Sequence, residues 1–188
     1  MKITHNRNPE PQEYEGGRVK LHLLTAVTRP GNLAVIADSI AAASFSTEWE
    51  YVWHLRFDPL RQDVGGHEQK NAMLDGIEDG WVWILDDDTL MHPDLLRRLA
   101  DVLKAQPDAL ALVVSQDRKD GRHLVAAEEN VRVCFIDAGQ AIMRRDLIGN
   151  HRLPLNYEGD GHWLCDLLPG KDGVVYLDET LSLHNALS

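Results

Sequence analysis

Apolar and polar positions along the chain follow two spacings, one typical of strands and the other of helices. Apolar runs at residues 81–85 and 109–115 are typical of strands buried on both faces of a sheet. Residues 19–27 and 50–57 are also predicted to be strands. Residues 33–43 and 94–103 carry apolar side chains at helical spacing, and residues 67–78 can form a third helix. The first half therefore predicts three strand-helix units and a fourth strand.

The second half of the chain is less regular. It predicts a turn or hairpin at 117–123, a strand at 131–136, a strand that runs into a short helix at 138–148, a helix after the loop 157–162, and late strands at 174–177 and 181–183. Alternating strands and helices imply a mostly parallel sheet, which becomes mixed toward the end. We expect an α/β fold, with helices flanking this sheet in one domain over 19–188 and a polar lead-in over 1–18.

Composition narrows the classes of partner and compartment. The chain has 188 residues and a formal charge of -11, which argues against DNA, RNA or an anionic membrane as a partner bound through charge. No apolar run approaches the roughly 20 residues that span a bilayer, and the N-terminus lacks an apolar signal core. We therefore expect a cytoplasmic protein without a membrane span. Cys134 and Cys165 show no metal-binding spacing and are expected to be buried thiols.

Three consecutive carboxylates follow the apolar run 81–85. Asp86, Asp87 and Asp88 fall at the carboxyl end of that predicted strand, where open α/β sheets bind ligands. A divalent cation would offset the repulsion among such close charges. Aspartate is also common in turns and at helix N-termini, so an acidic loop that begins a helix explains one or two of these residues equally well. Both interpretations stay open on these residues alone.

Two further positions carry candidate chemistry. Glu158 and Asp160 lie among glycines just before a predicted helix, where a carboxylate can accept a proton from a hydroxyl group or simply cap the helix. His184 emerges from an apolar strand near the chain end. A lone histidine in that setting is more often structural than a ligand.

Taken together, these segments resemble the glycosyltransferases of the GT-A fold, and in particular the inverting glycosyltransferase family 2. The resemblance runs from about residue 19 to residue 184. The pieces that carry it, in the order of the family, are LLTAVTRPGN, RFDP, QKNAMLDGIEDGWVWILDDDTLMHPDLL with its DxD element, DAGQAIMRRDLI, YEGDGHWLCDLL and LSLHN.

The resemblance implies a role for each matching residue. On the donor side it places Thr28, Arg29, Asp58, Asn71, Asp86 and Asp87. Asp86 and Asp88 form the DxD pair, and Asp88 with His184 would hold Mn²⁺ or Mg²⁺. Asp87 is not expected to be a direct ligand. Asp160, which is nearer the following helix, is preferred to Glu158 as the catalytic base.

The implied activity is transfer of a sugar from a nucleotide-diphosphate donor, with a UDP-sugar favoured, to a hydroxyl group with inversion. The acceptor, whether a saccharide, a lipid-linked molecule or a protein, would contact the loops 117–130 and 150–162. A non-catalytic nucleotide-sugar-binding domain is the main alternative. A nucleotidyltransferase is less favoured because the loop after the first strand has one glycine and one arginine. A phosphatase of the haloacid dehalogenase type fails because Thr89 comes one position too early for its motif.

Overall fold

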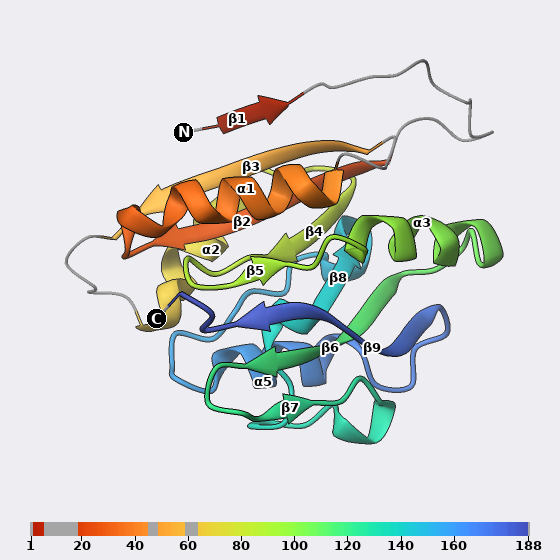
Figure 1. The fold of residues 1–188 in the computed structure, drawn as a ribbon. Coiled ribbons are helices and arrows are strands. Elements are labelled where there is room, and N and C mark those ends of the chain that lie inside the picture. Colours follow the sequence, from red (N-terminus) through yellow and green to blue (C-terminus); the bar gives the residue numbers. More distant parts are fainter. Residues whose placement is uncertain (1, 6–18, 45–48, 59–63, 188) are drawn as a thin grey trace, which may run out of the picture.

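The computed structural model describes residues 2–5, 19–44, 49–58 and 64–187. Among these residues, nine strands form one sheet with helices on both sides (Figure 1). The order across the sheet is β1 (Lys2–His5), β3 (Glu50–Phe57), β2 (Lys20–Val27), β4 (Trp81–Ile84), β8 (Ala141–Arg144), β6 (Ala111–Arg118), β9 (Val174–His184) and β5 (Leu90–Met91), and β7 (His123–Leu124) pairs with β6.

The strand directions confirm the α/β class and the mixed sheet. Strands β3, β2 and β4 are parallel neighbours, as the strand-helix repeats of the first half predict. Strand β8 is antiparallel to both β4 and β6, whereas β9 is parallel to β6. The second half thus makes the sheet mixed, and β9 runs between β6 and the short edge strand β5.

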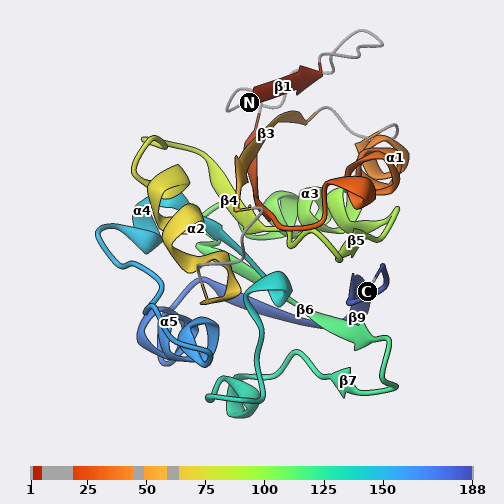
Figure 2. The ribbon, with the colours of Figure 1, turned by 90° about the vertical axis from the view of Figure 1, so that its left-hand side faces the viewer.

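Helices cover both faces of the sheet. They are α1 (Leu33–Ser44), α2 (His67–Leu74), α3 (Leu95–Ala105), α4 (Arg145–Ile148) and α5 (Gly159–Leu167), with short 3₁₀ turns η1 (Pro30–Asn32), η2 (Val64–Gly66), η3 (Glu128–Asn130) and η4 (Ala138–Gln140). Figure 2 shows α1 and α3 on one side of the sheet and α2, α4 and α5 on the other. No helix in the described part of the chain is long and apolar enough to cross a membrane.

Strand β4 separates two apolar cores. Because successive side chains of a strand point to opposite faces, Trp81 and Trp83 pack with α1 and α3, whereas Val82 and Ile84 pack with α2 and α5. All four side chains are buried. This arrangement confirms the prediction of a strand buried on both faces, and it fixes where the chain leaves the sheet after Leu85.

Several expectations from the sequence are wrong in detail. Residues 131–136 form turns instead of a strand, because Cys134 has a left-handed φ of 69° and the segment packs under the start of α5. Neither cysteine is buried: this turn exposes Cys134, and Cys165 is partly exposed. Helix α2 ends at Leu74, short of residue 78. The lead-in over 1–18 stays a prediction, and within it Lys2–His5 pairs with β3 as an edge strand.

Candidate functional site

The three aspartates after β4 point in different directions. Asp87 turns back toward the end of β2: its Oδ2 accepts hydrogen bonds from the backbone N–H groups of Thr28 and Arg29, both at 2.6 Å, and from the Thr28 hydroxyl at 2.9 Å. Its Oδ1 lies 2.7 Å from the guanidinium of Arg29. Since β2 and β4 are parallel neighbours, their ends meet, and Asp87 holds the loop after β2 in place.

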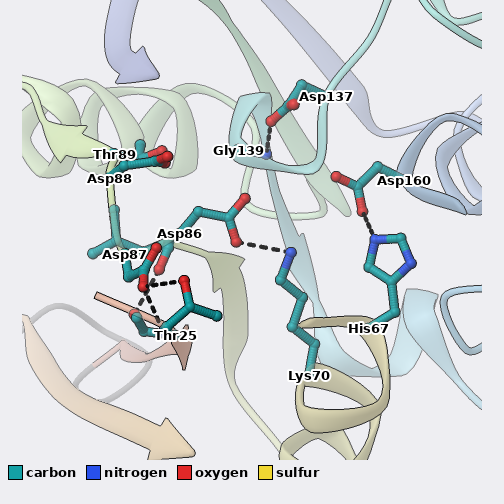
Figure 3. Close-up of polar contacts among 12 residues, drawn as sticks. Thr25, His67, Lys70, Asp86, Asp87, Asp88, Thr89, Asp137, Gly139 and Asp160 are labelled. Carbon is teal, nitrogen blue, oxygen red and sulfur yellow. Dashed lines mark hydrogen bonds and ion pairs between the residues drawn. The ribbon is translucent and has the colours of Figure 1, made fainter. Parts of the chain in front are cut away.

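Asp86 faces helix α2 instead. Its Oδ1 lies 2.8 Å from Nζ of Lys70, a side chain that is 1% exposed (Figure 3). Burial alone would lower the pKa of this ammonium, but the facing carboxylates of Asp86, Asp160 and Asp137 raise it above the ordinary lysine value. Lys70 therefore stays charged and supplies a buried cation to the site.

Asp88 lies in a crowded acidic position. Its Oδ2 is 3.0 Å from the Arg29 guanidinium, and the residue is buried. Burial and the neighbouring Asp86 nevertheless raise the pKa of the Asp88 carboxyl, although His184 and Arg29 act in the opposite direction. The nearby cations therefore do not fully offset the cost of keeping this carboxylate ionised in a buried, acidic position.

The end of strand β9 and the residues after it contact Asp88 and Thr89. Nδ1 of His184 lies 3.1 Å from the hydroxyl of Thr89, and the backbone N–H of Leu187 donates to the carbonyl of Asp88 at 3.3 Å. With its amide oriented for hydrogen bonding, Asn185 donates to Oδ2 of Asp88 at 2.8 Å and accepts from Nε2 of His184 at 3.0 Å. The structure thus brings His184 and Asp88 together, from positions almost 100 residues apart in the chain.

Asp160 lies in the first turn of α5 and faces the same cluster. Its Oδ1 is 3.0 Å from Nε2 of His67 (Figure 3). Burial would raise the pKa of this carboxyl, but the facing Lys70 and His67 lower it below the ordinary aspartate value. Asp160 is therefore held ionised. Glu158, by contrast, is exposed and contacts Cys134 and His162, so the geometry favours Asp160 as the candidate base.

The two other residues predicted on the donor side, Asp58 and Asn71, make different contacts. Asp58 is buried at the end of β3, where its backbone N–H donates to the carbonyl of Val27 in β2 at 2.9 Å. Asn71 uses both ends of its amide on the backbone of Leu153, with two hydrogen bonds of 2.9 Å. Asn71 therefore ties α2 to the loop before α5, and we leave it out of the proposed donor site.

Sequence reasoning missed three residues of the cluster. His67 and Lys70 lie one turn apart on α2, and each contacts a different carboxylate, Asp160 or Asp86. In the sequence, these two residues could have been found as a basic pair at positions i and i+3 on the helix that precedes the strand before the acidic run. The third is Asp137, a half-buried carboxylate that accepts from the N–H of Gly139 at 2.8 Å and whose pKa is raised mainly by burial.

Comparisons with known proteins show the fold. No family model matches the sequence, and no curated protein is recognisably similar to it. Among solved structures, it is similar to S. aureus TarS 1–349 in complex with UDP-GlcNAc, with a TM-score of 0.68 and 14% identity over 90% of this chain and 61% of that one. The structure of TarS 1–349 with UDP also has a TM-score of 0.68, at 14% identity, over 88% of this chain and 60% of that one.

The full TarS structure matches with a TM-score of 0.66 and 14% identity, over 88% of this chain but 36% of that protein. The chain thus spans about 60% of the TarS 1–349 fragment. Identity this low carries the fold alone. The match confirms the expectation from the sequence: the chain has the GT-A fold.

Proposed function

We propose that the protein transfers a sugar from a nucleotide-diphosphate donor, with a UDP-sugar favoured, to an acceptor hydroxyl with inversion. One observation carries this proposal. In a GT-A fold, an ionised carboxylate, Asp160, faces the acidic strand end at Asp86–Asp88, and the buried Lys70 lies between the two. The complex of TarS with UDP-GlcNAc supports a nucleotide-sugar as the donor.

The donor side combines positive charge and fixed backbone. Asp87 orders the loop at Thr28 and Arg29, so the guanidinium is held at the end of β2 beside Asp88. Lys70 is held near the same place by Asp86. Both cations are positioned before a ligand arrives, and they would attract and orient a diphosphate.

The residues present fit a divalent cation. Asp88 and His184 would hold it, because a cation there would offset the cost of keeping the Asp88 carboxylate ionised in a buried position beside Asp86. The described residues contain no group of three or more side chains that could hold a metal ion, so a bound Mn²⁺ or Mg²⁺ would take its other ligands from water and substrate phosphates. When bound, the cation would stabilise negative charge on the leaving diphosphate.

Asp160 would accept the proton of the attacking hydroxyl. Lys70 and His67 keep its carboxylate ionised, so it is ready to accept a proton at neutral pH. The acceptor oxygen then bonds to the anomeric carbon as the bond to the diphosphate breaks. Attack from the face opposite the leaving group inverts that carbon.

Release of UDP from a panel of UDP-sugars, with and without candidate acceptors, tests the proposal. We expect slow release without an acceptor, faster release with the right one, and loss of both in excess chelator. Asp160→Asn should lower turnover about 100- to 10,000-fold while donor binding is kept, because a general base contributes about that much. Glu158→Gln, the matched control on the preceding turn, should retain activity.

The opposite result has a clear meaning. Binding of UDP without any turnover, unchanged in Asp160→Asn, would identify a non-catalytic nucleotide-sugar-binding domain instead. Absence of nucleotide binding altogether would reject both functions.

A further inference from the structure

The imidazole of His67 is enclosed between two oxygen atoms. His67 is the first residue of α2 and is 2% exposed. Its Nδ1 lies 2.8 Å from the carbonyl oxygen of Pro154, and its Nε2 lies 3.0 Å from Oδ1 of Asp160 (Figure 3). That Oδ1 is buried, and among the described residues no hydrogen bond of regular geometry reaches it, so its contact with Nε2 is that of an ion pair at 3.0 Å.

Two glycines make room for this ring. A Cβ atom on Gly159 would lie 2.2 Å from the Pro154 oxygen and 2.7 Å from Cε1 of His67. A Cβ atom on Gly65 would lie 2.7 Å from Nε2 of the same ring. The backbone therefore approaches the ring from both sides, and the packing fixes which nitrogen faces which oxygen.

The two contacts determine where protons lie. A carbonyl oxygen can only accept, so Nδ1 of His67 carries a proton that it donates to Pro154. A bare Nε2 would then present its lone pair to the carboxylate of Asp160, which is repulsive. One more proton must lie between Nε2 and Oδ1, and His67 with Asp160 binds it as a pair.

The surrounding charges act on the carboxylate of Asp160. Among the described residues, the titratable side chains that act on it include His67 and Lys70 from α2, His184 from the end of β9, and Asp137 from the turn before η4. The first three are basic, and together they lower the pKa of Asp160 in spite of its burial. These charges therefore favour an ionised Asp160 that faces Nε2 of His67.

We propose that His67 is a positioning residue: it donates from Nε2 to Oδ1 of Asp160 and thereby holds the carboxylate so that Oδ2 receives the proton of the acceptor hydroxyl. This inference rests on the proposed function. In the step itself the hydroxyl oxygen bonds to the anomeric carbon, the bond from that carbon to the diphosphate breaks, and its electron pair leaves with the nucleotide. The hydroxyl proton passes to Oδ2, and the proton on Nε2 keeps the carboxylate oriented.

Two amide substitutions test the Nε2 contact and the Nδ1 contact of His67 one at a time. The amide nitrogen of His67→Gln reaches the position of Nε2, whereas that of His67→Asn reaches the position of Nδ1. We expect His67→Gln to keep most of kcat and His67→Asn to lose about 100-fold, the cost of a catalytic group displaced by about 1 Å. The donor KM should change little in either variant. Equal losses, or a larger loss in His67→Gln, would overturn the proposal.

The pH profile gives a readout that a purely structural role would not move. His67 helps to lower the pKa of Asp160, so its removal should raise that pKa. The acidic limb of the kcat profile should therefore move to higher pH in His67→Asn. An unmoved limb would contradict the positioning role.

A measurement without turnover keeps the two proposals apart. In ¹⁵N NMR spectra of the wild-type protein at neutral pH, both ring nitrogens of His67 should show the shifts of protonated nitrogen, whereas Asp160→Asn should lose one of these protons. A singly protonated ring in the wild type would refute the pair, whatever the activity. A doubly protonated ring in a protein without turnover would refute the transferase proposal and leave the pair intact.

Discussion

At the residue scale, three adjacent carboxylates have three different tasks. Asp87 accepts four hydrogen bonds or ion-pair contacts from Thr28 and Arg29 and is structural. Asp86 is paired with Lys70. Asp88 keeps a raised pKa beside Arg29, mainly because it is buried and close to Asp86. Adjacent residues of one type thus differ because each points to a different element.

Replacement of Asp87 should destabilise the fold. Asp87→Ala leaves two backbone N–H groups without their acceptor and leaves the Arg29 guanidinium with Asp88 as its remaining carboxylate, so we expect the free energy of unfolding to fall by about 3 kcal/mol. Urea unfolding measures this change. Asp79→Ala is the control, because Asp79 is a largely exposed partner of Lys20 and should matter by less than about 1 kcal/mol. Similar losses in both variants would contradict the structural role of Asp87.

Replacement of Asp88 should have the opposite effect on stability. The folded state raises the pKa of Asp88, so the native protein binds this proton more tightly than the unfolded chain does. The wild type therefore loses stability as the pH rises through the folded-state pKa of this group. Asp88→Asn should remove that loss and be more stable than the wild type at neutral pH.

The measurement is urea unfolding of Asp88→Asn and wild type from acidic to neutral pH. The two curves should converge toward acidic pH, where Asp88 is protonated. The same variant should no longer respond to Mn²⁺ in the UDP release assay, which would show that function keeps a carboxylate where stability disfavours it. A variant that is less stable than the wild type at neutral pH would contradict this account.

At the element scale, α2 links the two halves of the site. His67 and Lys70 reach Asp160 on α5 and Asp86 after β4, and Asn71 on the same helix binds the loop at Leu153. Polar contacts with Asp86 on one side and with Asp160 and the loop at Leu153 on the other thus hold α2, which is short and weakly apolar. Its position sets the separation between the donor-side carboxylates and the candidate base.

The start of α5 should tolerate no side chain at Gly159. A Cβ atom there would lie 2.2 Å from the Pro154 oxygen, so Gly159→Ala must displace the loop or the His67 ring. We expect a loss of about 1–3 kcal/mol in the free energy of unfolding, the usual cost of overpacking, together with reduced turnover. Calorimetric or urea unfolding checks the first effect and UDP release the second.

Gly76→Ala is the matched control for that experiment. A Cβ atom on Gly76 would meet its nearest neighbour, the carbonyl oxygen of Met73, at 3.6 Å, which is ordinary contact. Its stability should change by less than about 1 kcal/mol. If Gly159→Ala behaved like Gly76→Ala, the close packing around His67 would be wrong.

At the scale of the whole molecule, the sheet order brings distant segments together with α2 to assemble the site. The ends of β2 and β4 meet because these strands are parallel neighbours, β9 returns beside β6 to deliver His184, and α5 delivers Asp160. A donor bound at this edge, as proposed above, would contact several of these segments and should stabilise the native state as a unit.

Nucleotide binding should therefore raise the melting temperature. UDP at about 100 times its Kd should add about 2.7 kcal/mol to the free energy of unfolding. Thermal unfolding with UDP, with UDP and Mn²⁺, and with UMP as the control for the diphosphate checks this. The largest shift should come from UDP with Mn²⁺. Equal shifts for UMP and UDP would contradict a site built for the diphosphate.

Local sequence patterns predicted helices and strands well where the spacing of apolar residues matched the faces that are buried in the structure. The strand at β4 is apolar throughout because both of its faces are covered, so its pattern was unambiguous. The segment 131–136 has strand-like composition, but packing under α5 and the left-handed Cys134 make it a turn. Residues that touch the acidic run were harder to find, because nothing in a sequence shows which buried lysine or histidine pairs with which carboxylate.

The sequence by itself determined the class of fold and the acidic strand end, since these depend on period, residue type and local spacing. The preference for Asp160 over Glu158 as the base stays a prediction. Only the tertiary structure decided which task each aspartate has and that His67 and Lys70 belong to the site. The reason is physical: backbone periodicity is local, whereas an ion pair such as Lys70–Asp86 at 2.8 Å exists only after distant elements pack and exclude water. The chemistry of the site is therefore a property of the packed sheet and its covering helices.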